Sequence, residues 1–250
     1  MCFELDSEPP IPRISGAAVS HDDLVLEAAD GNRFAAFRAV PDGGPASTGI
    51  VILPDVRGLY RFYEELALRF AERGQAALAF DYFGRTAGVA KRADDFEYVP
   101  HVQETKPGLV QEDVGACVRH LRALDCTSIF TVGFCFGGRN SWLAAASGHG
   151  LAGAVGFYGH PGERNGVIGP TQRAADMDCP ILALQAGDDQ NITAPDNAAF
   201  DEALGLAGVE HEVIVYDGAP HSFFDRKQEE FAEASEDAWR RVTAFVELYA

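Results

Sequence analysis

The segment Gly133-Phe134-Cys135-Phe136-Gly137-Gly138 limits the possible folds more than any other part of the chain. It follows a run of apolar and β-branched residues at 128–134, which predicts a strand, and it leads into a helical pattern at 138–146. A strand that turns directly into a helix holds the central residue of the turn in a strained conformation. Glycines on both sides remove Cβ atoms that would collide there, so we expect Cys135 to project above a sheet edge.

Buried-type strands and helical segments alternate along most of the chain. This alternation favours an α/β fold, with a mostly parallel sheet covered by helices on both faces. The expected strands are 24–28, 33–40, 49–53, 75–80, 128–134, 151–157, 181–185 and 211–216, and the expected helices are 60–73, 109–124, 138–146, 198–206 and 228–249. A hairpin signal at Asp30-Gly31-Asn32 places the first two strands antiparallel at one edge. Together with the turn at Cys135, the pattern predicts an α/β-hydrolase fold.

The domain organisation is simple. At 250 residues the chain is long enough for one such domain, and no linker or repeat divides it, so residues 1–250 are expected to form a single unit. Residues 1–20 have no clear period and predict an extended N-terminal arm. Residues 84–107 also lack a strong period and predict a long functional loop, and whether 86–107 closes over the site as a lid is left open.

Composition excludes several classes of function. The formal net charge of −18 repels phosphate backbones and anionic membranes, so neither nucleic acid nor membrane is an expected partner. The N-terminus lacks the apolar stretch of a signal peptide, and no apolar run is long enough to span a bilayer. Five scattered cysteines without a Cys-x-x-Cys pair argue against a disulfide framework or a zinc site. These features favour a reducing cytoplasm, and the oligomeric state stays open.

Cys135 has two readings. Most cysteines are small buried hydrophobic residues, and this one could be another. At the start of a helix, however, its sulfur meets the positive end of the helix dipole and free backbone N–H groups, which favour a thiolate and later an oxyanion. The preceding strand and the following helix support the second reading, a nucleophile.

A nucleophile needs a base, and the base needs an acid that orients it. In α/β-hydrolases both follow the nucleophile along the chain, acid first and then histidine. The strand at 181–185 leads to Asp188 and Asp189, and the strand at 211–216 leads to His221 on a Gly/Pro loop before the last helix. Ile192, three residues after Asp189, favours Asp189 as the acid, with Asp188 as the alternative.

The loop after the first buried strand, Leu53-Pro54-Asp55-Val56-Arg57-Gly58, should also reach this edge of the sheet. A backbone N–H there, predicted to be that of Val56, could join that of Phe136 in an oxyanion hole. Asp55 could pair with the cysteine proton or with an arginine. The simpler reading of Asp55 is a turn-forming residue after proline.

These segments resemble the dienelactone hydrolase family. The resemblance rests on GFCFGG at 133–138, Asp188-Asp189, GAPHSFF at 218–224, PDVRGLY at 54–60 and FDYFGR at 80–85, and it spans roughly residues 20–248. It implies a Cys135-His221-Asp189 triad that opens lactones or cleaves activated esters through an acyl-enzyme, without metal or cofactor.

The resemblance also implies roles around the triad. In the family the thiol rests against a carboxylate on the loop after the first core strand, until a substrate carboxylate frees it. Asp55 matches this position, where the familiar residue is Glu. Arg85 matches one of the family's substrate-binding arginines, and Arg226 matches the second with a shift of one residue relative to His221.

Two alternatives accompany this hypothesis. The first is a general carboxylesterase or thioesterase without a lactone preference, and whether the substrate carries a carboxylate is open. The second is a non-catalytic relative that uses Cys135 as a redox-sensing thiol. A sensor needs neither His221 nor Asp189, so their presence in the expected order favours the enzyme.

Overall fold

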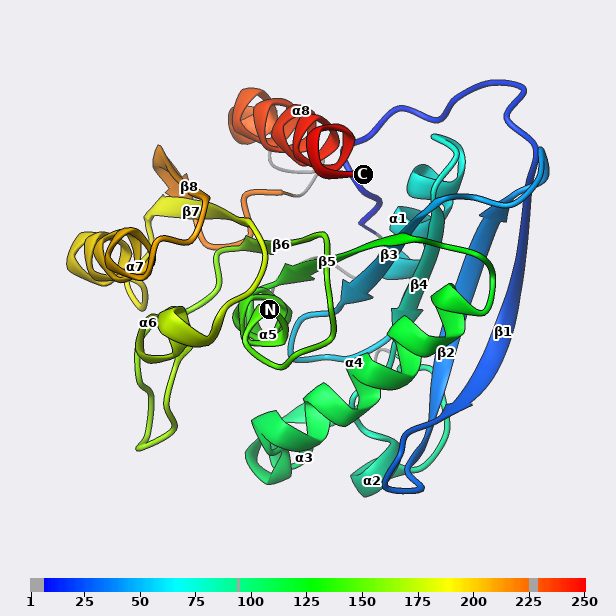
Figure 1. The fold of residues 1–250 in the computed structure, drawn as a ribbon, viewed down its shortest axis with the longest axis horizontal. Helices are drawn as coiled ribbons and strands as arrows, with labels where there is room; N and C mark the ends of the chain where they lie inside the picture. Colours follow the sequence, from blue (N-terminus) through cyan, green and yellow to red (C-terminus); the bar gives the residue numbers. More distant parts are fainter. Residues whose placement is uncertain (1–6, 94, 225–228) are drawn as a thin grey trace.

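One eight-stranded sheet organises the computed structural model, which describes residues 7–93, 95–224 and 229–250. The strand order is β1-β2-β4-β3-β5-β6-β7-β8 (Figure 1). The strands are β1 (Val19–Glu27), β2 (Arg33–Pro41), β3 (Thr48–Leu53), β4 (Ala76–Phe80), β5 (Ser128–Phe134), β6 (Gly153–Phe157), β7 (Ile181–Asp188) and β8 (His211–Pro220). This is the predicted α/β-hydrolase fold.

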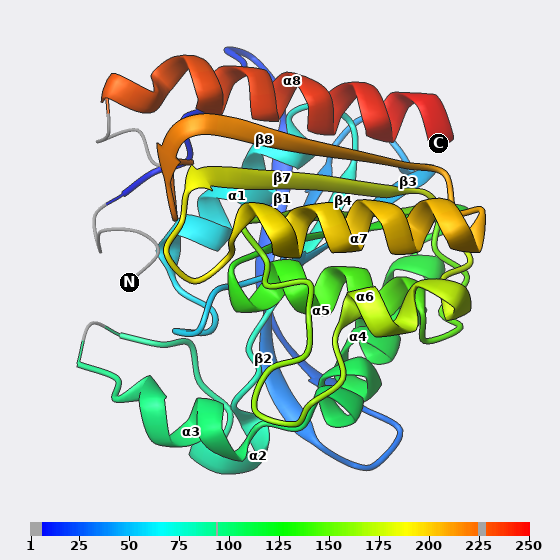
Figure 2. The same cartoon turned by 90° about the vertical axis from the view of Figure 1, so that its left-hand side faces the viewer.

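The pairing of the strands follows the predicted pattern. β1 and β2 form an antiparallel hairpin around Gly31, whose positive φ of 83° suits a glycine. β2 also pairs antiparallel with β4, and all other neighbours in the sheet are parallel. The carboxyl ends of the parallel strands therefore meet at one edge, seen at the left for β7 and β8 in Figure 2.

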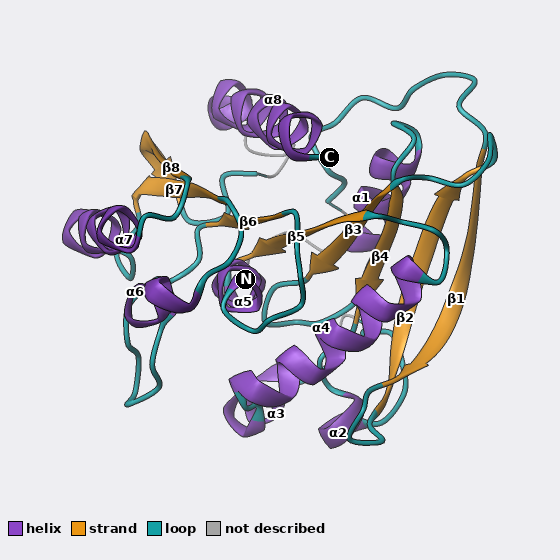
Figure 3. Cartoon of the chain, in the orientation of Figure 1, coloured by secondary structure: helices purple, strands orange, loops and turns teal. Residues whose placement is uncertain are grey.

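The helices form two layers, shown in purple in Figure 3. They are α1 (Arg61–Ala71), α2 (Gly84–Ala87), α3 (Tyr98–Glu104), α4 (Pro107–Arg122), α5 (Phe136–Ala145), α6 (Pro170–Arg173), α7 (Ala194–Ala207) and α8 (Ala232–Tyr249), with 3₁₀ turns at Ala174–Asp176 and Glu229–Phe231. Each layer covers its own hydrophobic core. The core beneath α1 and α8 contains Ile50 and Ile52, whereas the core beneath α4, α5 and α7 contains Val51 and Leu53. Alternate residues of β3 thus face opposite layers, as the two-residue period of a strand requires.

The structure corrects three sequence expectations. The segment 84–107 is not a structureless loop, because it contains α2 and α3. The first strand begins at Val19 rather than Leu24, so the N-terminal arm ends before residue 20. The short helix α6 was not expected. Within the described residues, no helix combines the length and apolar character needed to cross a membrane.

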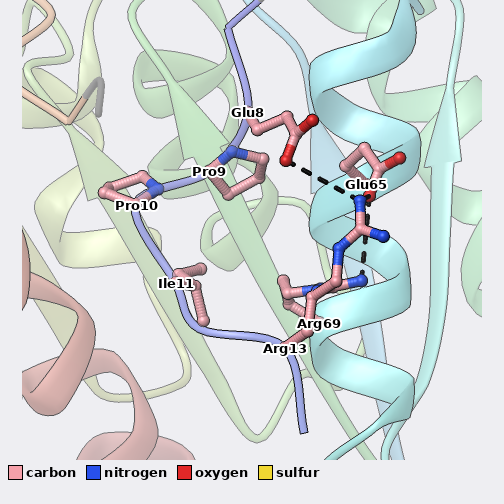
Figure 4. Close-up of a pocket in the computed structure, with 7 residues that line it drawn as sticks. All are labelled: Glu8, Pro9, Pro10, Ile11, Arg13, Glu65 and Arg69. Atoms are coloured by element: carbon pink, nitrogen blue, oxygen red, sulfur yellow. Dashed lines mark hydrogen bonds and ion pairs between the residues drawn. The ribbon is translucent and has the colours of Figure 1, made fainter. Parts of the chain in front are cut away.

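The described part of the arm packs on α1. Ile11 is buried in the core beneath that helix, and Arg13 bonds Glu65 of α1 at 3.1 Å. Arm and helix together line a pocket of about 210 Å³, where Figure 4 shows Arg13 of the arm between Glu8 and Glu65. The arm is therefore held by apolar and ionic contacts.

Candidate active site

The turn at Cys135 has the strained geometry that the sequence predicted. Cys135 adopts φ 57° and ψ −111°, and helix α5 begins at the next residue. A Cβ atom at Gly133 would collide with the carbonyl oxygen of Gly137, and one at Gly137 would collide with that of Leu53. Glycine is required at both positions, because the end of β3, the turn and α5 approach each other at backbone distance.

Cys135 differs from the other described cysteines in its exposure. Cys117, Cys126 and Cys179 are buried, and Cys135 is half-buried. Burial raises the pKa of all three buried thiols, that of Cys179 to about 12. A high pKa leaves little thiolate at neutral pH, so these three are poor nucleophiles. Cys135 alone among the described cysteines combines access to solvent with a position at a helix N-terminus.

His221 and Asp189 contact each other at the same edge of the sheet. The Nδ1 atom of His221 lies 2.5 Å from Oδ2 of Asp189, whose other oxygen accepts hydrogen bonds from the N–H groups of Asn191 and Ile192. A proton on Nδ1 would make Nε2 the unprotonated nitrogen of His221, which is the nitrogen that can act as a base. Asp188, at the end of β7, is exposed. Of the two aspartates, the one that contacts His221 is therefore Asp189.

The electrostatics of this pair favour a charged acid. Burial opposes ionisation of Asp189, but the hydrogen bond from His221 and those from the backbone outweigh it and lower the pKa of Asp189. The His221 side chain is 32% exposed, and its ring lies 4.9 Å from that of Tyr158, centroid to centroid. His221 is therefore held on one side by a carboxylate and on another by an aromatic ring, yet stays accessible.

The loop after β3 carries one backbone N–H, that of Val56, which is not used in the hydrogen bonds of the loop. The N–H of Gly58 donates to the backbone carbonyl of Asp55, and the N–H of Arg57 donates to the Asp55 carboxylate at 2.8 Å. Asp55 N–H donates to the Tyr63 hydroxyl. Within the described chain, the N–H of Val56 has no hydrogen-bond acceptor.

Phe136, as the first residue of α5, lacks an intrahelical acceptor for its N–H. The tight contact between Gly137 and Leu53 brings this helix end close to the loop that carries Val56. The N–H groups of Val56 and Phe136, predicted to form an oxyanion hole, thus lie on adjoining segments and are not used in the hydrogen bonds of the loop or of the helix.

Asp55 is paired within its own loop. Its carboxylate is fully buried and accepts hydrogen bonds from Nη2 of Arg57 at 3.2 Å and from the hydroxyl of Tyr60 at 3.0 Å. Of the two sequence alternatives, the structure therefore gives Asp55 an arginine partner. Sequence analysis did not single out Arg57, although an arginine two residues after an aspartate in a turn is a usable signal.

Arg85, predicted to bind substrate, is engaged in ion pairs. Its Nη2 atom lies 2.7 Å from Asp30 on the β1–β2 turn, and its Nη1 atom lies 2.5 Å from the buried Asp113 of α4. The residue also lines a pocket of about 220 Å³ with Tyr82 and Lys106. Arg226, the second predicted arginine, lies outside the described residues.

The segment 86–107 is anchored at its centre. Arg92 donates to both carboxylate oxygens of the buried Asp81, at 3.0 and 2.7 Å, and its own N–H donates to the carbonyl of Leu59. The ring of His101 stacks on Phe96 at 5.0 Å. Both rings also contact that of Phe83, just after β4, so an ion pair and ring contacts fix this segment against the strand ends. Whether it moves as a lid stays a prediction.

Among the described residues, no group of three or more His, Cys, Asp or Glu side chains is arranged to hold a metal ion. The polar atoms at the strand ends are arranged instead as one thiol, one imidazole–carboxylate pair and two backbone amides. This is a set suited to acyl transfer.

Comparisons with known proteins agree with the fold. Residues 34–250 match the model of the dienelactone hydrolase family. A carboxymethylenebutenolidase of Rhodococcus opacus is 29% identical and covers 100% of this chain and 97% of its own length. A Methylorubrum extorquens protein provisionally named as the same enzyme is 30% identical over 86% of this chain and 76% of its own.

A solved structure from Klebsiella pneumoniae, provisionally named a dienelactone hydrolase, has a TM-score of 0.81 at 24% identity, covering 93% of this chain and 100% of its own. That likeness supports the fold, and the match over residues 34–250 supports the family. The chain therefore belongs to the dienelactone hydrolase family of the α/β-hydrolase superfamily.

Proposed function

We propose that this carboxylic ester hydrolase opens a lactone or cleaves an activated ester through a thioacyl-enzyme on Cys135, with His221 as base and Asp189 as the orienting acid. The observation that carries the proposal is the 2.5 Å contact between His221 Nδ1 and Asp189, because a proton held on Nδ1 makes Nε2 the basic nitrogen of the ring. Asp189 fixes the tautomer and stabilises the imidazolium that forms during the reaction.

The first half-reaction forms the thioacyl-enzyme. His221 Nε2 takes the thiol proton while the sulfur of Cys135 attacks the substrate carbonyl carbon, and the carbonyl π electrons move to oxygen. The N–H groups of Val56 and Phe136 hydrogen-bond to this oxyanion. When the carbonyl re-forms, the bond to the leaving oxygen breaks, and His221 donates its proton to that oxygen.

The second half-reaction releases the acid. His221 takes a proton from water, the water oxygen attacks the thioester carbon, and the sulfur leaves and regains a proton from His221. Enols and aryloxides suit this route because they are good leaving groups for attack by a thiol. The names of the Rhodococcus and Methylorubrum relatives favour a lactone, in which the leaving enol stays part of the product.

The test is trapping of the acyl group. Wild-type protein mixed with p-nitrophenyl acetate should show a burst of p-nitrophenol, and intact-mass spectrometry should find one acetyl group, mapped to Cys135. Cys135→Ala should lose the burst and the turnover. Cys117→Ala, which removes a buried thiol, is the matched control and should retain both. Full esterase activity in Cys135→Ala would overturn the proposal.

The alternatives differ in measurable ways. A general esterase would hydrolyse p-nitrophenyl acetate but leave 4-carboxymethylene-butenolide intact, which would remove the lactone preference and keep the mechanism. A redox sensor would show peroxide oxidation of Cys135 without turnover of any ester. The hydrogen-bonded His221–Asp189 pair favours the enzyme over the sensor.

A further inference from the structure

The arginines that follow β3 and β4 share a feature that bears on the substrate. Arg57, Arg85 and Arg92 each form an ion pair with a fully buried aspartate. These partners are Asp55, Asp113 and Asp81. A guanidinium that is already neutralised by a buried carboxylate has little attraction left for a second one.

The Asp55–Arg57 pair lies on the loop whose first residues approach the turn at Cys135, because the backbone of Leu53 and Pro54 comes close to Gly137. Tyr82 connects the two sites, because its hydroxyl bonds the carbonyl of Pro54 at 2.8 Å and its ring packs edge-on against Phe136, next to Cys135. Burial, followed by the negative charges of Asp55, Asp81 and an ionised Cys135, raises the pKa of the Tyr82 phenol. Asp55 and Cys135 therefore each lie one residue from a direct contact of Tyr82.

Within the described residues, the Arg57 side chain forms its hydrogen bonds with Asp55 and Tyr60 alone. Its Nη2 atom donates to Asp55 and to the Tyr60 hydroxyl, and its guanidinium carbon lies 4.3 Å from the centre of the Tyr60 ring. Its Nε and Nη1 atoms are buried and have no hydrogen-bond acceptor in the described part of the chain. Burial on its own lowers the pKa of Arg57, but the charge of Asp55, the hydrogen bond to it and the neighbouring tyrosines together outweigh burial and raise the pKa. The guanidinium therefore stays charged.

We propose that Arg57 is a built-in counter-ion for Asp55, which holds this carboxylate within its loop and away from the thiol proton of Cys135, and that the enzyme therefore prefers neutral esters and lactones. This inference rests on the proposed thioacyl mechanism. Arg57 is a positioning residue, since it acts on the thiol through Asp55. The formal charge of −18 works in the same direction, because it lowers the local concentration of anionic substrates.

The first measurement is the pH dependence of Cys135 alkylation by iodoacetamide. Among the described residues, the charged or titratable groups on the segments around the thiol are Asp55 with Arg57, Tyr60 and Tyr63 on the α1 side, Tyr82 and the Asp81–Arg92 pair after β4, Tyr158 after β6, and the His221–Asp189 pair beyond β8. Removing one charge of a neutral pair should shift the alkylation midpoint by about one pH unit.

The direction of the shift is the critical result. Arg57→Met leaves Asp55 uncompensated, so the midpoint should rise, whereas Asp55→Asn leaves Arg57 uncompensated, so it should fall. The double variant should return close to wild type. Arg61→Met removes a neighbouring arginine whose side chain is 61% exposed, and should leave the midpoint unchanged. Unchanged midpoints in both single variants would overturn the counter-ion role, even if Arg57→Met alone is poorly folded.

The second measurement compares p-nitrophenyl hexanoate with the mono-p-nitrophenyl ester of adipic acid, which adds a carboxylate to the same chain length and leaving group. Wild type should hydrolyse the neutral ester with the higher kcat/KM. A hundredfold preference for the adipate ester, reduced by Arg226→Met, would overturn the substrate inference. Loss of both activities in Cys135→Ala would leave the thioacyl mechanism standing in either case, whereas retained activity would refute that mechanism separately.

Discussion

Replacing Asp189 by Asn tests the orientation of the base with little change in shape. The Asp189 side chain is 1% exposed and accepts from the N–H groups of Asn191 and Ile192 as well as from His221. An asparagine oxygen can keep the two backbone bonds, which directs its NH₂ group at His221 Nδ1. The ring would then hold its proton on Nε2, the atom that has to accept the thiol proton.

The expected loss follows from this tautomer. Misplacing the proton of the base lowers kcat by about 10³- to 10⁴-fold in triad enzymes, which corresponds to about 4–5.5 kcal/mol of transition-state stabilisation. The protein should stay folded with a modestly lower Tm, because both backbone hydrogen bonds survive and only the stabilisation from the ionised carboxylate is lost. Steady-state hydrolysis of p-nitrophenyl acetate measures the first effect, and melting followed by circular dichroism measures the second.

Asp188→Asn is the matched control, because it makes the same change at the neighbouring, exposed position. Its kcat should stay within about twofold of wild type, since exposed substitutions away from the site have small effects. The reasoning is refuted if Asp189→Asn retains wild-type kcat, or if Asp188→Asn causes the larger loss.

Three further predictions concern stability, pH and thiol reactivity. Arg85→Met should leave the buried Asp113 without its ion-pair partner and lower the free energy of unfolding by about 3–5 kcal/mol. Adding Asp113→Asn should restore part of this loss. A raised KM without any loss of Tm would instead make Arg85 a substrate ligand. The pKa of Asp189 is lowered in the folded state. Its contribution to stability is therefore complete above the unfolded pKa near 4 and is lost as the pH falls through the lower folded pKa. The Tm difference between wild type and Asp189→Asn should accordingly shrink in acid and not in base. Peptide mapping after brief iodoacetamide treatment of the native protein should find Cys135 alkylated well before Cys117 or Cys179, and the reverse order would contradict the burial of those two thiols.

The elements that could be predicted from the sequence are those whose signal is local. β5 spans Ser128–Phe134 as expected, because it is apolar on both faces and ends at a glycine turn. β1 was predicted to begin five residues too late, because its first half, Val19–Asp23, lies at the sheet edge and consists mostly of polar residues without a clear alternation of burial. Pairing with β2 up to Pro41 extends that half as a strand. Helices α2 and α3 were missed because contacts with distant residues, rather than an apolar period, hold them.

The same division applies to the candidate site. The turn at Cys135 follows from glycines within the segment itself, and the order of acid and histidine follows from strand ends that the sequence indicates. The partners of the arginines do not follow in this way. Arg85 pairs with Asp30 and Asp113, which are 55 and 28 positions away, so only the folded chain brings them together.

This division suggests how such a site can vary. The position of Cys135, the proposed nucleophile, depends on backbone contacts that tolerate only glycine, so substitutions at Gly133 or Gly137 should remove the site as a whole. The charge near the thiol depends on side chains of one loop, where Asp55 and Arg57 are two positions apart. A pair of substitutions in that loop can therefore alter the charge beside Cys135 while the turn, the base and the acid stay in place. Substrate preference can change on this scaffold without rebuilding the nucleophile, because different residues carry the two properties.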